Sequence, residues 1–130
     1  MGYGISSTLH ARLLAAAGAS PEAEICGLLF GTGERIEQVR PCANVAPDPA
    51  RSFELDPTAL FAAHRAAREG APAPIGHYHS HPSGEPVPSA RDAAQAMGDG
   101  ALWLIVTAEA ARLFVSRRAG TFEEVALTVE

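Results

Sequence analysis

Three histidines alternate with other residues in one short run, Gly76-His77-Tyr78-His79-Ser80-His81-Pro82, and this run restricts the fold more than any other feature of the chain. It follows the apolar residues Ala73-Pro74-Ile75, which favours a strand. Successive side chains of a strand point to opposite faces, so the three imidazoles share one face. Alternate residues lie about 7 Å apart along the backbone, and two such imidazoles can bind one ion at about 2.0–2.1 Å. The run therefore predicts a strand that presents metal ligands.

An aspartate is the candidate third ligand. Pro82 cannot donate to a sheet ladder, so the strand ends there, and the Gly- and Pro-containing residues 83–88 predict a loop. A helix capped by Ser89 places Asp92 in its first turn, and the loop can fold Asp92 back beside the histidines. Two histidines and one aspartate suit Zn²⁺, and three protein ligands leave a position for water, as in catalytic sites. The chain has no Cys-x-x-Cys pair of the kind found in structural zinc sites.

Each of these features also has a purely structural interpretation. The pattern Ser89-x-x-Asp92 is a helix capping signal, in which the aspartate serves only the helix N-terminus. Runs of histidine also occur in solvated loops. Short motifs match by chance at a high rate, so the metal interpretation depends on the combination and not on any one motif.

The combination resembles the JAB/MPN (Mov34/PAD-1, JAMM-motif) zinc metalloprotease family, in its small prokaryotic single-domain form. The family signature is His-Ser-His-Pro, a loop, and then Ser-x-x-Asp; here His79-Ser80-His81-Pro82 is followed by seven residues and then Ser89-Ala90-Arg91-Asp92. A second element of the family is a glutamate just before a buried strand, and Glu24-Ile25-Cys26-Gly27-Leu28 fits it. The resemblance spans most of the chain.

The resemblance implies a role for each matching residue. It makes His79, His81 and Asp92 zinc ligands, Glu24 the general base for the zinc-bound water, and Ser89 the hydroxyl that helps hold the oxyanion of the tetrahedral intermediate. Many relatives have an aromatic or aliphatic residue at the position of His77, so we expect His77 to pack beside the site or to donate a hydrogen bond and not to be a ligand. Glu22 is a nearby alternative to Glu24, but it lies beside a proline in the turn, whereas Glu24 directly precedes the strand.

The remaining sequence predicts an α/β fold in which helices alternate with hairpin-linked strands. The resemblance implies a mixed central β-sheet flanked by helices, the JAB/MPN fold, which is similar to that of the cytidine deaminases. Length and a hydrophobic content of 47% favour one domain over residues 1–130. The Pro-rich residues 41–51 predict a surface loop, which in the family lies, with residues 52–55, near the substrate groove. The expected helices are 8–18, 57–69 and 89–98, and the other expected strands are 25–30, 35–40, 101–107, 112–117 and 122–129.

Charge and composition exclude several classes of protein. A net charge of −5 and no basic cluster beyond Arg117-Arg118 argue against binding to nucleic acid or to a membrane surface. The first residues do not resemble a secretory signal, and no apolar run is long enough to span a membrane. A cytoplasmic location is therefore expected, and Cys26 and Cys42 are expected to be unreactive reduced thiols.

The resemblance also implies a reaction, the hydrolysis of the amide bond after the C-terminal Gly-Gly of a ubiquitin-like or sulfur-carrier protein. Glu24 would assist the attack by a zinc-bound water. The resemblance also suggests an adenylating, E1-like enzyme as a partner. The first alternative is a non-catalytic MPN scaffold, which is expected to have lost a ligand or the glutamate; all are present here. The second is a zinc deaminase of the related fold, which needs a Pro-Cys-x-x-Cys segment that the chain lacks.

Overall fold

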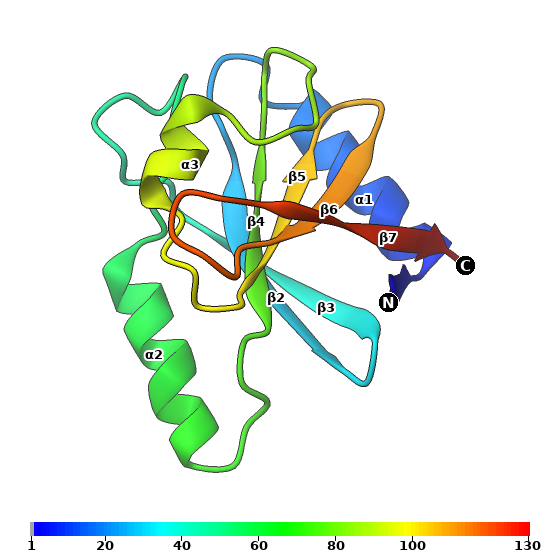
Figure 1. The fold of residues 1–130 in the computed structure, drawn as a ribbon, viewed down its shortest axis with the longest axis vertical. Helices are drawn as coiled ribbons and strands as arrows, with labels where there is room; N and C mark the ends of the chain where they lie inside the picture. The colour runs from blue at the N-terminus through cyan, green and yellow to red at the C-terminus, as the bar shows by residue number, and fades with distance from the viewer. Residues whose placement is uncertain (1) are drawn as a thin grey trace.

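A computed structural model describes residues 2–130 and places their strands in one mixed sheet (Figure 1). The strand order is β1-β3-β2-β4-β5-β6-β7, and the sheet closes on itself because β1 pairs in parallel with both β3 and β7. The elements are β1 (Gly2–Ile5), α1 (Ser7–Gly18), β2 (Cys26–Thr32), β3 (Arg35–Cys42), α2 (Pro57–Arg68), β4 (Gly76–Ser80), α3 (Ala90–Gln95), β5 (Leu102–Val106), β6 (Ala111–Val115) and β7 (Glu123–Val129).

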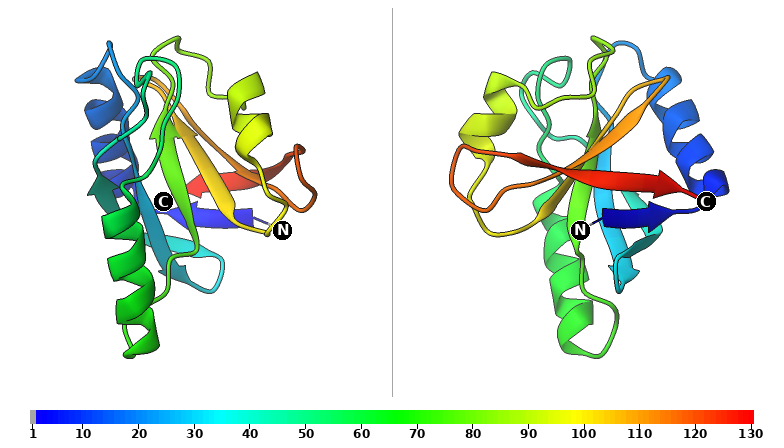
Figure 2. Two further views of the ribbon diagram at one scale, coloured as in Figure 1. Left: turned by 90° about the vertical axis from the view of Figure 1, so that its left-hand side faces the viewer. Right: turned by 45° about the vertical axis from the view of Figure 1, so that its right-hand side comes forward.

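The two faces of the sheet have different partners (Figures 1 and 2). On one face, α1 buries Leu9, Leu13 and Ala17 against the large core that includes Tyr78 and Leu104. The other face carries the aromatic cluster around Trp103, with α2 packed beside it near the end of β2. Because β2 and β5 are covered on both sides, all residues of 26–30 and of 102–106 are buried, as their continuous apolar sequence predicts.

The histidine-bearing strand β4 lies near the middle of this sheet. It pairs antiparallel with β2, where His79 faces Cys26, and in parallel with β5, where His79 faces Ile105. The face on which His77 and His79 lie is opposite to the face covered by α1, since Tyr78 packs into the α1 core. The end of β4 therefore presents His79, and His81 just beyond it, on a strand that is paired along both edges.

Most expected elements are present, with three differences. The helix expected from residue 8 begins one residue earlier, at Ser7, because Ser6 is its N-cap and Ser6 Oγ accepts the Leu9 N–H at 3.1 Å. The third helix ends at Gln95, because Ala96 is extended and buried while Gly98 turns the chain at φ +71°. Strand β1 was not expected, since its sequence Gly-Tyr-Gly-Ile has weak strand propensity; pairing with two neighbours holds it in the sheet. Among residues 2–130, no helix has both the length and the apolar character to cross a bilayer.

Candidate metal centre

The predicted ligands come from two elements that meet at the end of β4. His79 belongs to the strand itself and is completely buried. His81 follows it, and its N–H donates to the Val106 carbonyl at 2.9 Å, which extends the pairing with β5 by one step. Asp92 lies in the first turn of α3 and is 3% exposed. The 83–88 loop thus returns the chain to the strand end, as its composition predicts.

Three side-chain atoms converge at short and nearly equal distances. His79 Nε2 lies 3.0 Å from His81 Nε2. Asp92 Oδ2 is 3.2 Å from His79 Nε2 and 3.1 Å from His81 Nε2. Ligands bound tetrahedrally at about 2.0–2.1 Å would be separated by about 3.3 Å. The three atoms are therefore spaced as the ligands of one small cation.

The hydrogen bonds of His81 support this interpretation. Its Nδ1 donates to the Glu85 carbonyl at 2.8 Å, so in the neutral ring Nε2 carries a lone pair. That lone pair faces His79 Nε2 and the Asp92 carboxylate, which can only accept when ionised. Acceptors that face one another at this distance require a proton or a metal ion between them. The chemistry of the donor set fits Zn²⁺, which binds imidazole nitrogen and carboxylate oxygen.

Without a metal, protonation of the cluster fulfils the same need. Burial opposes a charge on His81, but its hydrogen bonds to Asp92 and to the Glu85 carbonyl raise its pKa. Burial alone would raise the pKa of Asp92, but hydrogen bonds from His79 and His81 hold it well below its usual range. A proton on His81 and a metal ion are thus alternatives for one space, and metal binding must release that proton.

His79 is held in a different way. Its Nδ1 is buried and has no hydrogen-bond partner among the described residues. Its ring instead stacks on Phe53, with centroids 4.1 Å apart and planes 16° apart. Phe53 comes from the loop before α2 and is itself 5% exposed.

Glu24 lies beside the convergent atoms, two residues before β2 begins. One of its carboxylate oxygens, His79 and His81 offer atoms that all lie within 4.8 Å of one another. Glu24 is buried and its Oε1 has no partner among residues 2–130, whereas Glu22 is exposed. Burial raises the pKa of Glu24 to about 7, which suits a group that takes and returns a proton near neutral pH.

The backbone around Glu24 is fixed to the strand that carries the histidines. The N–H of Ile25 donates to Ser80 Oγ at 2.9 Å, and the N–H of Ser80 donates to the Ile25 carbonyl at 2.9 Å. These residues are 55 positions apart in the sequence. The glutamate and the histidines are therefore brought together by the pairing of β2 with β4.

Ser89 forms a complete capping box with Asp92. Ser89 Oγ accepts the Asp92 N–H at 3.1 Å, and the Ser89 N–H donates to Asp92 Oδ2 at 2.9 Å. The capping interpretation of this motif is therefore present in the structure. It does not compete with a catalytic one, because a hydroxyl that accepts one hydrogen bond keeps its own hydrogen to donate. Ser89 also lines a cavity of about 190 Å³ together with Glu24 and His81.

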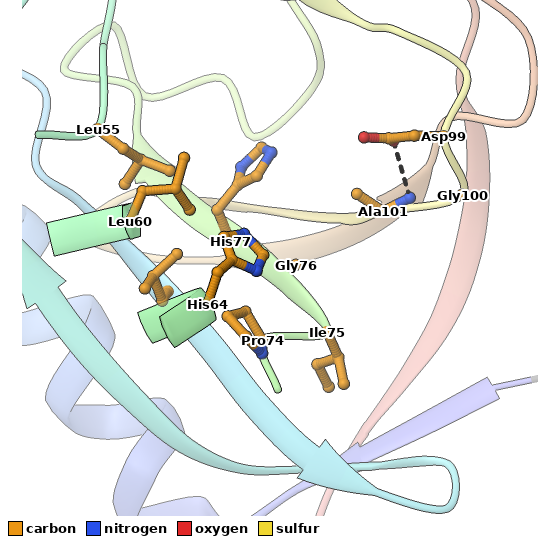
Figure 3. Close-up of a pocket in the computed structure, with 11 residues that line it drawn as sticks. Leu55, Leu60, His64, Pro74, Ile75, Gly76, His77, Asp99, Gly100 and Ala101 are labelled. Atoms are coloured by element: carbon orange, nitrogen blue, oxygen red, sulfur yellow. Dashed lines mark hydrogen bonds between the residues drawn. The ribbon is translucent and has the colours of Figure 1, made fainter. Parts of the chain in front are cut away.

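The other histidines lie outside the convergent set. His77 packs edge-on against Trp103, with centroids 4.5 Å apart, and its Nδ1 has no partner among the described residues. His64 is exposed on α2. Both line a second cavity of about 470 Å³ (Figure 3), and neither belongs to the group of side chains that could share an ion.

Sequence reasoning missed two residues that shape the site, Asn44 and Phe53. Asn44 makes four side-chain hydrogen bonds, one of them to the Glu24 carbonyl. The signals were weak: Asn44 is the chain's only asparagine, within a Pro-rich loop, and Phe53 is a single aromatic residue between polar neighbours. Arg51, at the end of the same loop, lines the cavity with Glu24.

Convergent lone pairs beside a buried carboxylate of raised pKa are the arrangement with which metal-dependent hydrolases prepare water for attack on a carbonyl. The site defines that class. The chain belongs to the family described as prokaryotic homologs of the JAB domain, which it matches over residues 6–119.

Individual relatives agree with this assignment. The chain is 34% identical over 123 residues to a desampylase from Haloferax volcanii, which covers 93% of this chain and 87% of that protein. It is 40% identical over 70 residues to a probable TtuB-protein conjugate cleaving protease from Thermus thermophilus, covering 54% of this chain and 47% of the relative. The structure of a JAB1/MPN domain protein from Archaeoglobus fulgidus has the same fold, with a TM-score of 0.65, 22% identity and coverage of 99% and 98%. The chain is accordingly a hydrolase of the JAMM type.

Proposed function

We propose that residues 1–130 form one zinc metalloprotease domain that hydrolyses the amide bond after the C-terminal Gly-Gly of a ubiquitin-like or sulfur-carrier protein. The observation that carries the proposal is the convergence of His79, His81 and Asp92 beside the free carboxylate oxygen of Glu24. The names of the relatives, a desampylase and a protease that cleaves TtuB conjugates, support the substrate class. An adenylating, E1-like enzyme is the partner we assign to the formation of such conjugates, and the reduced thiols of Cys26 and Cys42 support a cytoplasmic location.

In this proposal, His79, His81 and Asp92 hold the zinc ion. Bound zinc lowers the pKa of a water ligand to about 7 and polarises the substrate carbonyl. Glu24 accepts the proton of the attacking water at its free Oε1 and then returns it to the leaving amine. The pKa of about 7 suits both steps, because the carboxylate is then neither too weak a base nor too weak an acid.

Ser89 stabilises the oxyanion. Its oxygen is anchored by the Asp92 N–H, and the residue lines the cavity that Glu24 and His81 also line, so its own O–H is free to donate there. A donor that is held in place before the reaction loses no energy to reorganisation when charge develops. The capping bond therefore orients the catalytic hydroxyl.

We assign the cavity of about 470 Å³ to the part of the substrate that precedes its C-terminal Gly-Gly. Figure 3 shows Leu55 and Leu60 on one side, Asp99 with Ala101 on the other, and His77 between them. His77 precedes the ligand His79 by two residues, so the cavity lies about 7 Å along β4 from the metal position. The narrow site cavity of about 190 Å³ suits residues without side chains at the cleaved bond.

The test compares zinc content and cleavage in three proteins: wild type, His79→Ala and Glu24→Gln. The substrate is a ubiquitin-like protein fused through its Gly-Gly end to a reporter. We expect about one zinc per chain in wild type and Glu24→Gln but little in His79→Ala. Cleavage by Glu24→Gln should fall by about 10²–10⁴. Full activity of Glu24→Gln would remove the glutamate from the mechanism, and zinc binding without cleavage by wild type would favour the scaffold.

A further inference from the structure

The loop between β3 and α2 is organised by the side chain of Asn44. Asn44 Nδ2 donates to the carbonyls of Glu24 at 2.9 Å and Ser52 at 3.1 Å. Asn44 Oδ1 accepts the N–H groups of Ala46 at 3.1 Å and Glu54 at 3.0 Å. An amide side chain has two donor hydrogens and two acceptor lone pairs, so every one of them is used. Asn44 thereby joins both ends of the loop to the segment that carries Glu24.

The same loop reaches Glu24 a second time. The Glu24 N–H donates to the Pro49 carbonyl at 2.7 Å. Both backbone polar groups of Glu24 are thus bound by the 44–54 loop, while the carboxylate has an oxygen with no partner among the described residues. Among residues 2–130, no hydrogen bond to the Glu24 carboxylate fixes its direction, so that direction depends on how the Glu24 backbone is held.

We propose that Asn44 is a positioning residue that fixes the Glu24 carboxylate for proton transfer. The inference rests on the proposed function, in which Glu24 is the base. Asn44 does not touch the predicted ligands, because its four partners are backbone groups of residues 24, 46, 52 and 54. Its removal should therefore affect proton transfer and leave metal binding intact.

The size of the effect follows from the sensitivity of catalysis to geometry. A misplacement of about 1 Å can cost about 100-fold in rate, and loss of the base itself costs about 10²–10⁴. We expect Asn44→Ala to lower kcat by about 10- to 100-fold with little change in KM. Zinc affinity, measured by competition with a chelator, should stay at the wild-type value.

A double-mutant cycle with Glu24→Gln separates positioning from general destabilisation. If Asn44 acts through Glu24, Asn44→Ala lowers kcat in the wild-type background and has no further effect in the Glu24→Gln background, because residues that act as a unit are not additive. The control is Ser6→Ala, which removes the cap of α1. It should reduce stability by about 1 kcal/mol without changing kcat.

Each outcome decides the inference. Equal losses of kcat in both backgrounds, or wild-type kcat in Asn44→Ala, would overturn it. If Asn44→Ala does not fold, Asn44→Asp keeps the two accepted bonds and removes the two donated ones, and the same cycle applies. An inactive Glu24→Gln beside a fully active Asn44 variant would refute the inference alone, whereas an active Glu24→Gln would refute the proposed base.

A second, independent observation concerns Phe53. Metal-binding histidines almost always donate their second ring nitrogen to a carbonyl, carboxylate or water, yet His79 Nδ1 has no such partner among residues 2–130. Phe53 is the nearest ring to His79 and stacks on it, whereas Trp103 lies edge-on with centroids 5.9 Å apart, so Phe53 is the contact best placed to fix the orientation of His79. The geometry points to Phe53 as the positioning residue for this ligand, in the role that a hydrogen bond plays for His81.

The test is metal affinity and not activity. We expect Phe53→Leu to bind zinc about 10- to 100-fold more weakly in chelator competition, the loss typical when a supporting contact of a ligand is removed. The visible spectrum of the cobalt-loaded protein should also change. Phe122→Leu is the matched control, since Phe122 packs on Trp103 in the same aromatic cluster, with centroids 4.9 Å apart. Equal losses in both variants, or none in Phe53→Leu, would overturn this assignment.

Discussion

The strand side and the connection side of the metal centre are built by different means. On the strand side, His79 is completely buried, paired with β2 and β5, and stacked on Phe53. On the connection side, His81 and Asp92 are 11 residues apart and are held by local hydrogen bonds, to the Glu85 carbonyl and within the Ser89 capping box. The first arrangement needs the paired sheet, while the second needs one loop, one helical turn and a single backbone bond to the sheet, from the His81 N–H to the Val106 carbonyl. Substitutions on the two sides should therefore have separable effects.

The largest expected effect is on the strand side, at Gly76. A Cβ added there would lie 2.2 Å from the Leu102 carbonyl oxygen on the neighbouring strand. Gly76→Ala must therefore displace β4 from β5, and we expect it to lower the free energy of unfolding by about 3 kcal/mol. Urea denaturation of the metal-free protein measures this loss.

The matched control for Gly76→Ala is Gly18→Ala. A Cβ on Gly18 would make only an ordinary contact, 3.4 Å from Ala108 Cβ. This change should be neutral or slightly stabilising, because alanine restricts the unfolded chain. Equal free energies of unfolding for the two variants would show that the close packing of β4 on β5 does not stabilise the strand side.

A smaller effect is expected on the connection side, from Ser89→Ala. Loss of the cap should cost about 1 kcal/mol of unfolding free energy, and the loosened Asp92 should weaken zinc binding. Ser6→Ala removes the corresponding cap of α1 and should cost a similar amount without changing zinc binding. If both variants bind zinc as wild type does, the capping box does not position Asp92.

A pH dependence of stability is expected where the two sides meet, at Glu24. In the metal-free protein the pKa of Glu24 is raised from 4.5 to about 7 by burial. The folded state then binds more protons than the unfolded state between these values, so this contribution to stability is present below pH 4.5 and is lost as pH rises to about 7. Glu24→Gln should abolish it. Denaturation of metal-stripped wild type and Glu24→Gln from pH 4.5 to 8 measures the difference in their free energies of unfolding. This difference should shrink steadily as pH falls, because the charged form of Glu24 is the destabilising one. A difference that stays constant with pH would contradict the raised pKa.

Local patterns predicted the connection side well. Pro82 ends the strand, the Gly- and Pro-containing loop follows, and Ser89 caps the helix that carries Asp92, as the spacing of these residues indicates. The start of α2 at Pro57 was predicted for the same reason, since a proline at the first helical position and its capping residue, Asp56, are neighbours in the sequence. That residues 1–130 form a single domain stays a prediction, and so does the role of each site residue.

The sequence by itself determined the residues that could serve as ligands, their strand and helix, and the family to which the pattern belongs. Only the tertiary structure decided that Glu24 lies beside the histidines, that Asn44 binds its backbone, and that Phe53 stacks on His79. The physical reason is the range of the interactions. Caps and alternation act over a few residues, whereas the contact between residues 25 and 80 spans 55 positions and forms only when β2 pairs with β4.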